Sequence, residues 1–295
     1  MNRLLIFGGG FVGGNLACLA QRQGWDVTIA DNFYRSGLDA VQWKTVDITQ
    51  AEGVAEVFAE VQPQAVVNVA AIANIDQAEQ EKDLTWKVNV DGARLLAENC
   101  ATDHTKYIFF SSDAVFDGQG QGYTEKDAPA PVNYYGVTKA EAEKAVLSAC
   151  PSAVVIRISL VLGFAVTGGN SFFSALEGKL KDGKDVPCPA GEIRTPVDVL
   201  TLSECVLELA GSDFSGRLHI GATDSLGRYE LTRKIARSLG YDEKLVKLQD
   251  AASGQSGRAP RHQNGIICVT KAQRLLTTKL LSTDEGIRRA IQERL

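Results

Sequence analysis

The chain has 295 residues, 44% apolar and 23% charged, which is enough for one large α/β domain with a smaller lobe. The net charge of −5 argues against nucleic acid as the main partner, because phosphate binding needs a basic surface. Six scattered cysteines indicate reduced thiols and a cytoplasmic protein, and no apolar run approaches the length of a membrane span. The three isolated histidines predict no metal site.

Short apolar runs alternate with helical patterns through the first half of the chain. This alternation predicts a doubly wound parallel sheet of the Rossmann type, with right-handed crossovers and helices on both faces. The strands are nearly continuous apolar runs, as expected when both faces of a sheet are covered. We expect strands at residues 3–7, 26–30, 44–46, 65–69, 107–110 and 153–158, and helices at 12–23, 51–60, 76–100 and 134–149.

After residue 158 the pattern changes to shorter elements separated by Gly- and Pro-rich segments. We interpret residues 1–162 as a dinucleotide-binding domain and residues 163–295 as a smaller substrate-binding lobe, with the chain returning to the first domain near 195–220. Residues 253–258 are the expected flexible loop. The elements expected here are helices at 170–180, 198–210, 229–239 and 283–294, and a strand at 217–220.

A glycine-rich turn links the first strand to the first helix. Gly8, Gly10 and Gly13 fit the pattern GxGxxG, in which glycine allows a tight turn, a close approach of the backbone to a pyrophosphate, and close packing of helix on strand. Phe11 and Val12 open the helix, whose free N–H groups and dipole favour an anion. The alternative is an ordinary Gly-rich turn, which the position between strand and helix disfavours.

Asp31 ends the second predicted strand, 18 residues after Gly13. A carboxylate at this position accepts hydrogen bonds from the adenosine ribose and repels a 2′-phosphate, so we predict NAD as cofactor, with NADP as the alternative. Arg35 lies close enough in sequence to weaken this preference. The competing interpretation of Asp31 is a cap for the loop that follows it.

Three further positions at strand ends suit the cofactor. Asp47 can accept from the adenine amino group while Ile48 packs on the ring, although Asp47 is equally suited to cap the helix at 51–60. Ala70 and Ala71 end the fourth strand and are small enough for close approach of a cofactor. Their alternative role is close packing alone.

Ser112 follows the fifth strand, and Tyr135 and Lys139 stand four residues apart on the next helix. Side chains at this spacing share a face, so both can point to one reacting centre at the carboxyl edge of the sheet. Reduction of a ketone requires a proton donor. A tyrosine serves as one when the Lys139 ammonium and the positive nicotinamide of the oxidised cofactor bring its pKa toward neutrality. Ser112 can donate a hydrogen bond to the substrate oxygen.

These motifs resemble the extended short-chain dehydrogenase/reductase superfamily, and more narrowly its dTDP-4-dehydrorhamnose reductase branch. The resemblance is carried by SSDAVFDG at 111–118, YYGVTK at 134–139, and segments at 66–71, 88–93 and 258–261. It implies that Tyr135 is the catalytic acid/base and Lys139 its partner, that both touch the cofactor ribose, and that Asn89 supports a proton-relay water. Ser112 and Asp113 would contact the substrate, a nucleotide-linked sugar. A homodimer is one assembly that we consider.

The resemblance leaves several functions open. The pair Asp113-Ala114 replaces the Asp-Glu pair that related 4,6-dehydratases need, so dehydration is disfavoured. Reduction of a 4-keto group is the leading hypothesis, followed by epimerisation with a retained NAD. The third is a non-catalytic regulatory subunit, because the same branch includes a partner of methionine adenosyltransferase.

Arg194 and Arg258 stand beside prolines in predicted loops of the second half. A guanidinium suits bidentate contact with phosphate, so we expect at least one of them to face the cleft opposite Tyr135 and to bind the substrate diphosphate. The alternative is a surface ion pair with Glu192 or Asp198.

Overall fold

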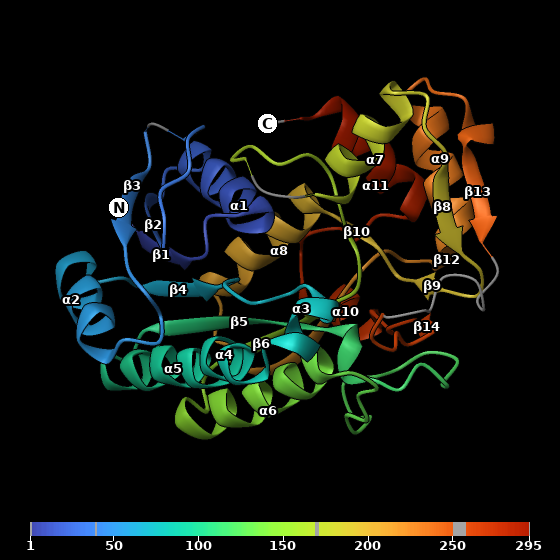
Figure 1. Ribbon diagram of the computed structural model, residues 1–295. Coiled ribbons are helices and arrows are strands. Elements are labelled where there is room, and N and C mark those ends of the chain that lie inside the picture. The colour runs from blue at the N-terminus through green and yellow to red at the C-terminus, as the bar shows by residue number, and fades with distance from the viewer. Residues whose placement is uncertain (1, 39, 169–170, 250–257, 295) are drawn as a thin grey trace.

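The computed structural model describes residues 2–38, 40–168, 171–249 and 258–294, so residues 253–257 of the predicted loop lie outside it (Figure 1). Its centre is a seven-stranded parallel sheet in the order β11-β6-β5-β4-β1-β2-β3, which confirms the predicted doubly wound α/β class. The strands are β1 (Arg3–Phe7), β2 (Asp26–Asp31), β3 (Gln42–Thr45), β4 (Ala65–Asn68), β5 (Lys106–Ser112), β6 (Val154–Ile158) and β11 (Gly216–Ile220).

Helices cover both faces of this sheet, as Figure 1 shows with α1 and α8 above it and α5 and α6 below. The apolar strand residues are divided between two cores, one under each helical layer, and this explains their continuous apolar sequence. The helices of the first layer are α1 (Phe11–Arg22) and α8 (Val199–Ala210), and those of the second are α2 (Ala51–Val61), α5 (Ala93–Thr102) and α6 (Tyr134–Ala149).

The long helix predicted at residues 76–100 is wrong as a single element. The structure divides it into α3 (Ile75–Gln80), α4 (Lys82–Trp86), a π-helical turn η1 (Lys87–Gly92) and α5. The side chain of Asn89, inside the π-helical turn, hydrogen-bonds with both backbone groups of Ile72, and this tertiary contact competes with regular helical geometry. Turns of this kind are frequent at functional sites.

The second half of the chain adds a lobe with its own core, drawn at the right of Figure 1. Several of its strands were not predicted, because two-residue strands carry no periodic pattern. Among the described residues, none of the helices combines the length and apolar character that crossing a membrane requires. The remaining elements are α7 (Phe172–Lys181), α9 (Arg228–Ser238), α10 (Thr270–Leu275), α11 (Thr283–Gln292), β7 (Val161–Leu162), β8 (Val186–Pro189), β9 (Ile193–Arg194), β10 (Val197–Asp198), β12 (Leu226–Gly227), β13 (Val246–Gln249) and β14 (Asn264–Gly265).

A buried ionic cluster fastens α6 to three strands of the sheet. Glu143 on α6 accepts two hydrogen bonds of 2.7 Å from Arg157 on β6. It also accepts from the hydroxyl of Ser111 on β5 at 2.6 Å and from Nε of Arg217 on β11 at 2.9 Å. Glu143 and Arg157 are fully buried, so these donors compensate the desolvation of the carboxylate.

We predict that Glu143→Gln lowers the free energy of unfolding by about 3–5 kcal/mol, because Arg157 is then left buried without a counter-charge. Urea unfolding followed by circular dichroism measures this loss. Glu141→Gln on the same helix is the control, since Glu141 makes a partly exposed ion pair with Lys144 and should cost less than about 0.5 kcal/mol. Equal losses in the two variants would contradict the role given to the cluster.

Candidate active site

A cavity of about 680 Å³ runs along the carboxyl ends of the central strands, a size typical of ligand sites. It joins the glycine-rich turn at one end to the first turn of α6 at the other. Most of the residues predicted for the cofactor and the reaction line it together, and these are Gly8, Gly10, Phe11, Val12, Gly13, Asp31, Asp47, Ile48, Ala70, Ala71, Ser112, Tyr135 and Lys139.

The glycine-rich turn has the geometry that a dinucleotide requires. Gly8 has a φ of +101°, and a Cβ atom there would lie 2.8 Å from the backbone nitrogen of Ala70. A Cβ atom at Gly13 would lie 1.9 Å from the carbonyl oxygen of Gly8, so α1 can pack against β1 only with glycine at this position. Gly10 has no atom within 4 Å of its Cβ direction, which leaves space for a pyrophosphate at the helix N-terminus.

Asp31 lies at the end of β2 and braces the glycine-rich turn. Its Oδ2 accepts from the backbone of Gly9 and its Oδ1 from that of Asn32, both at 2.7 Å, so its loop-capping role is present. The Nε of Arg35 lies 3.8 Å from Oδ2, and its guanidinium lies over the ring of Phe33. Both charges line the cavity, where the carboxylate favours a ribose with a free 2′-hydroxyl and the guanidinium favours one with a 2′-phosphate.

Asp47 and Ile48 lie beside the turn that follows β3. The carboxylate of Asp47 accepts from the backbone and the hydroxyl of Thr49 at 2.9 and 2.8 Å. The N-cap of α2 is Gln50, which makes no capping bond through its side chain, so the expectation that Asp47 caps this helix is wrong. Ile48 is buried and forms an apolar wall suited to a base.

Asn89 stands behind the cavity wall. Its amide nitrogen donates to Thr138 on α6 at 3.1 Å, and its oxygen accepts from the backbone of Ile72 at 2.8 Å. Ile72 lines the cavity and Thr138 precedes Lys139, so Asn89 connects the loop after β4 to the helix that carries the reacting groups. The water-supporting role implied by the family resemblance stays a prediction.

The start of α6 places Tyr135 next to Ser112. Asn133 caps this helix by accepting from the backbone of Gly136 at 2.8 Å. A Cβ atom at Gly136 would lie 2.1 Å from the carbonyl oxygen of Ala114, so glycine lets the helix approach the strand end that bears Ser112.

Burial pushes both reacting groups of α6 toward their neutral forms. It raises the pKa of Tyr135 to about 12, against a smaller lowering by the nearby hydroxyl of Ser112. It also lowers the pKa of Lys139 to about 7, although the charge of Glu143 acts in the opposite direction. Burial in the protein alone therefore opposes the lowered Tyr135 pKa expected from the sequence, and that expectation included the positive charge of the oxidised cofactor.

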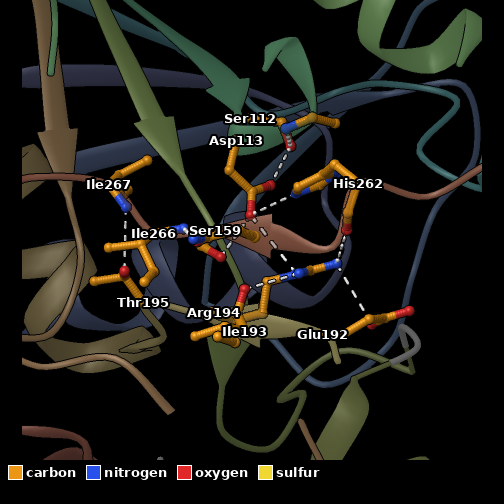
Figure 2. A network of polar contacts seen from close by, with 12 residues as sticks. Ser112, Asp113, Ser159, Glu192, Ile193, Arg194, Thr195, His262, Ile266 and Ile267 are labelled. Atoms are coloured by element: carbon orange, nitrogen blue, oxygen red, sulfur yellow. Dashed lines mark hydrogen bonds and ion pairs between the residues drawn. The ribbon is translucent and has the colours of Figure 1, made fainter. Parts of the chain in front are cut away.

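Arg194 does not take the position that we expected. It is buried, and its terminal nitrogens donate to the backbone oxygens of Ile193, Gln263 and His262 at 2.8 to 3.2 Å. Its Nε lies 3.8 Å from Asp113 Oδ2, and Figure 2 shows both side chains within one network. The guanidinium is thus engaged by protein acceptors, and one of them is the carboxylate of Glu192 at 3.4 Å, the ion pair that we gave as the alternative to a diphosphate contact.

Arg258 is exposed and lies 3.8 Å from Asp76 Oδ2, so its ion pair is with a carboxylate other than those expected. The neighbouring Arg261 binds the same carboxylate with two hydrogen bonds of 2.8 and 2.7 Å. These contacts lower the pKa of Asp76 to about 2, chiefly through the hydrogen bond from Arg261. A diphosphate contact of Arg258 stays a prediction.

Sequence reasoning missed two residues near Ser112. Ser159, which follows β6 and lines the cavity, donates to Asp113 Oδ2 at 2.6 Å. His262, near the C-terminus, is buried with its Nε2 3.2 Å from the same oxygen. The position of Ser159 at a strand end was an available signal, whereas His262 reaches the site only through tertiary folding.

We predict that Lys139→Met makes the protein more stable at neutral pH. The unfolded chain binds a proton at this lysine up to a pKa near 10.5 and the folded chain up to about 7, so the wild type gains stability as pH rises between these values. The slope contributed is at most about 1.4 kcal/mol per pH unit.

Denaturant unfolding at pH 7, 8, 9 and 10 tests this prediction, with Lys144→Met on the exposed side of α6 as the control. The advantage of Lys139→Met should shrink as pH rises. A constant difference between it and the wild type would show that Lys139 is not held at a lowered pKa.

Comparisons with known proteins agree with this geometry. The profile of the RmlD substrate binding domain matches residues 1–295. The dTDP-4-dehydrorhamnose reductase of Mycobacterium tuberculosis is 32% identical over 88% of this chain and 82% of its own length. The beta subunit of mouse methionine adenosyltransferase 2 is 29% identical over 79% of this chain and 71% of its own.

Among solved structures, the dTDP-4-dehydrorhamnose reductase of Bacillus anthracis in complex with NADP has a TM-score of 0.88 and 26% identity, covering 99% of this chain and all of that one. The fold, the glycine-rich turn and the Ser112, Tyr135 and Lys139 site thus occur together in a chain that the family profile matches from end to end. The chain belongs to the RmlD substrate binding domain family.

Proposed function

We propose that the protein is an NAD(P)-dependent oxidoreductase of the extended short-chain dehydrogenase/reductase type that reduces the 4-keto group of a nucleotide-linked sugar. The observation that carries this proposal is one continuous cavity with a dinucleotide-binding turn at one end and Ser112, Tyr135 and Lys139 at the other. The reductase relatives from Mycobacterium tuberculosis and Bacillus anthracis support the same activity and substrate class.

The residues present fit a dinucleotide. Gly10 leaves room for the pyrophosphate, Asp31 lies where ribose hydroxyls donate, and Ile48 offers an apolar wall to the base. When bound, a nicotinamide cofactor supplies the hydride for a carbonyl carbon. Lys139 is buried and stands four residues after Tyr135 on the same helix face, and it would hold the ribose next to the nicotinamide.

The protein's own part in the reaction is to deliver a proton. As the substrate oxygen becomes an alkoxide, the phenol of Tyr135 donates its proton to it. Ser112 orients that oxygen by hydrogen bonding. Because the pKa of Tyr135 in the free protein is about 12, the phenol carries its proton at neutral pH and is ready to act as the acid.

The sequence leaves two alternatives to reduction. An epimerase would use the same groups but keep its cofactor bound between turnovers, so cofactor that co-purifies with the protein would favour it. The relative that is a methionine adenosyltransferase subunit supports a regulatory role. The complete Ser112, Tyr135 and Lys139 set argues for catalysis, because a purely regulatory subunit has no need of it.

We also propose the domain assignment inferred from the sequence, in which residues 1–162 bind the cofactor and residues 163–295 mainly bind the substrate. Arg258 is the remaining candidate for the diphosphate. A homodimer and a cytoplasmic location belong to the same proposal, the latter resting on the free cysteines.

The first test is Tyr135→Phe, measured as oxidation of the reduced cofactor with dTDP-4-dehydrorhamnose. Turnover should fall by about 10² or more, as is usual when a general acid is lost, while cofactor affinity stays within a few-fold. Lys139→Ala should lower both turnover and affinity, because two roles are assigned to it. Full activity of Tyr135→Phe on this substrate would overturn the catalytic assignment.

The second test concerns the choice of cofactor. We expect NAD(H) to bind at least about tenfold more tightly than NADP(H), since the carboxylate of Asp31 repels a 2′-phosphate. Fluorescence titration of both cofactors measures the ratio. Asp31→Asn should narrow it and Arg35→Ala should widen it, whereas equal or tighter binding of NADP(H) to the wild type would show that Arg35 dominates.

A further inference from the structure

Asp113, the neighbour of Ser112, is the centre of a buried polar network, shown in Figure 2. Its Oδ1 accepts from the hydroxyl of Ser112 at 3.1 Å. Its Oδ2 accepts from the hydroxyl of Ser159 at 2.6 Å, and it lies 3.2 Å from His262 Nε2 and 3.8 Å from Arg194 Nε. The two oxygens of one carboxylate therefore face different groups, and only Oδ1 faces the reacting serine.

The position of His262 is built by the fold. A Cβ atom at Gly265 would lie 2.4 Å from Asp113 Oδ2 and 2.9 Å from His262 Nε2. On the other side, Gly118 has a φ of +77°, and its Cβ would lie 2.7 Å from that of His262. The imidazole, 4% exposed, thus occupies a slot that exists because both neighbours are glycine.

The segment that carries His262 is held at several points. Arg194 donates to the backbone oxygens of His262 and Gln263, and Asn133, the N-cap of α6, donates to that of Pro260 at 3.0 Å. Arg261 is paired with Asp76. The imidazole therefore has little freedom to leave Asp113, and its segment is tied directly to the helix that bears Tyr135.

Ser112 has a single proton and several acceptors that compete for it. In the structure the proton faces Asp113 Oδ1, while the serine oxygen accepts from the backbone of Ala114. A free carboxylate is a stronger acceptor than a ketone oxygen and would keep this proton. Donors that converge on Oδ2 draw negative charge toward that oxygen and leave Oδ1 a weaker acceptor.

We propose that His262 is a positioning residue for the reaction, which holds Asp113 through Oδ2 so that Ser112 can turn its proton toward the substrate oxygen and Tyr135. The inference rests on the proposed function, since it deepens the role of Ser112 in the same site. It assigns a function to a residue 150 positions away in the chain from the serine it serves.

Two substitutions separate this role from simple packing. In His262→Gln, the amide nitrogen takes the place of Nε2 and keeps an N–H group beside Asp113 Oδ2. In His262→Asn, the shorter amide takes the place of Nδ1 and cannot reach it. Both side chains are polar and no larger than imidazole, so both variants are expected to fold, and their melting temperatures check this. His104→Asn, at an exposed turn position, is the histidine control.

With dTDP-4-dehydrorhamnose, we expect His262→Asn to lower kcat by about tenfold, the effect of losing one close polar contact with a charged group, with KM within about threefold. His262→Gln should recover most of this loss. The pH midpoint that reports Tyr135 should rise in His262→Asn by about half a unit or more, because Asp113 is then less compensated and its charge raises the pKa of Tyr135. Unchanged kcat and midpoint in His262→Asn, or equal losses in the Asn and Gln variants, would overturn the proposal.

Other charges surround this network and must stay constant in the comparison. Arg194 and Glu192 face it from β9 and its approach, Arg228 from the start of α9, and Tyr135 from α6. All variants share them, so differences between variants at equal pH isolate His262.

A second measurement does not depend on turnover. In the complex with oxidised cofactor, the ultraviolet difference spectrum of tyrosinate, corrected with Tyr135→Phe, gives the ionisation of Tyr135 directly. The midpoint should rise in His262→Asn and not in His262→Gln. If no keto-sugar is reduced by the wild type but this shift is present, the proposed function fails and the positioning role stands. If the sugar is reduced and the shift is absent, the positioning role fails alone.

Discussion

The buried carboxylate of Glu143 is the constraint on which the site depends. It lies on the same helix face as Lys139 and binds side chains from β5, β6 and β11. One of these side chains belongs to Ser111, which precedes Ser112 in the chain. The carboxylate of Glu143 therefore holds both the strand end that bears Ser112 and the helix that bears Tyr135. Hydrogen-bonded buried charges tolerate little displacement, because each lost contact exposes the full cost of desolvation. These contacts of Glu143 fix the distance between Ser112 and Tyr135, although the two residues lie on different elements.

The same burial shapes the chemistry of the helix. Tyr135 and Lys139 are shifted in opposite directions, each toward its uncharged form. A proton donor that keeps its proton until charge develops on the substrate suits reduction. The polar groups around Asp113 complement this by balancing a negative charge that would otherwise oppose ionisation of the tyrosine.

Most of the central sheet and the cavity lining could be predicted because local patterns specify them. The turn at Gly8–Gly13 and the spacing of Tyr135 and Lys139 need no knowledge of distant residues. The role of Arg194 could not be decided from the sequence, because a guanidinium beside a proline looks the same whether its acceptors are phosphates or groups of the protein. The break in the helix near Asn89 depends on a contact with Ile72. The position of His262 depends on two glycines from separate segments of the chain. Neither feature therefore has a local signal in the sequence.

The position of β11 at one edge of the sheet has a consequence for how the protein is made. Arg217 lies 74 residues after Glu143, and β11 pairs with β6 only after the chain has passed through α7, β8 and α8. During synthesis, the first six strands therefore emerge before the residue that completes their ionic centre and covers the edge of β6. An uncovered strand edge is a template for association with other chains. The early part of the chain is thus most exposed to aggregation, and to the action of chaperones, while the ribosome is still translating the residues between β6 and β11.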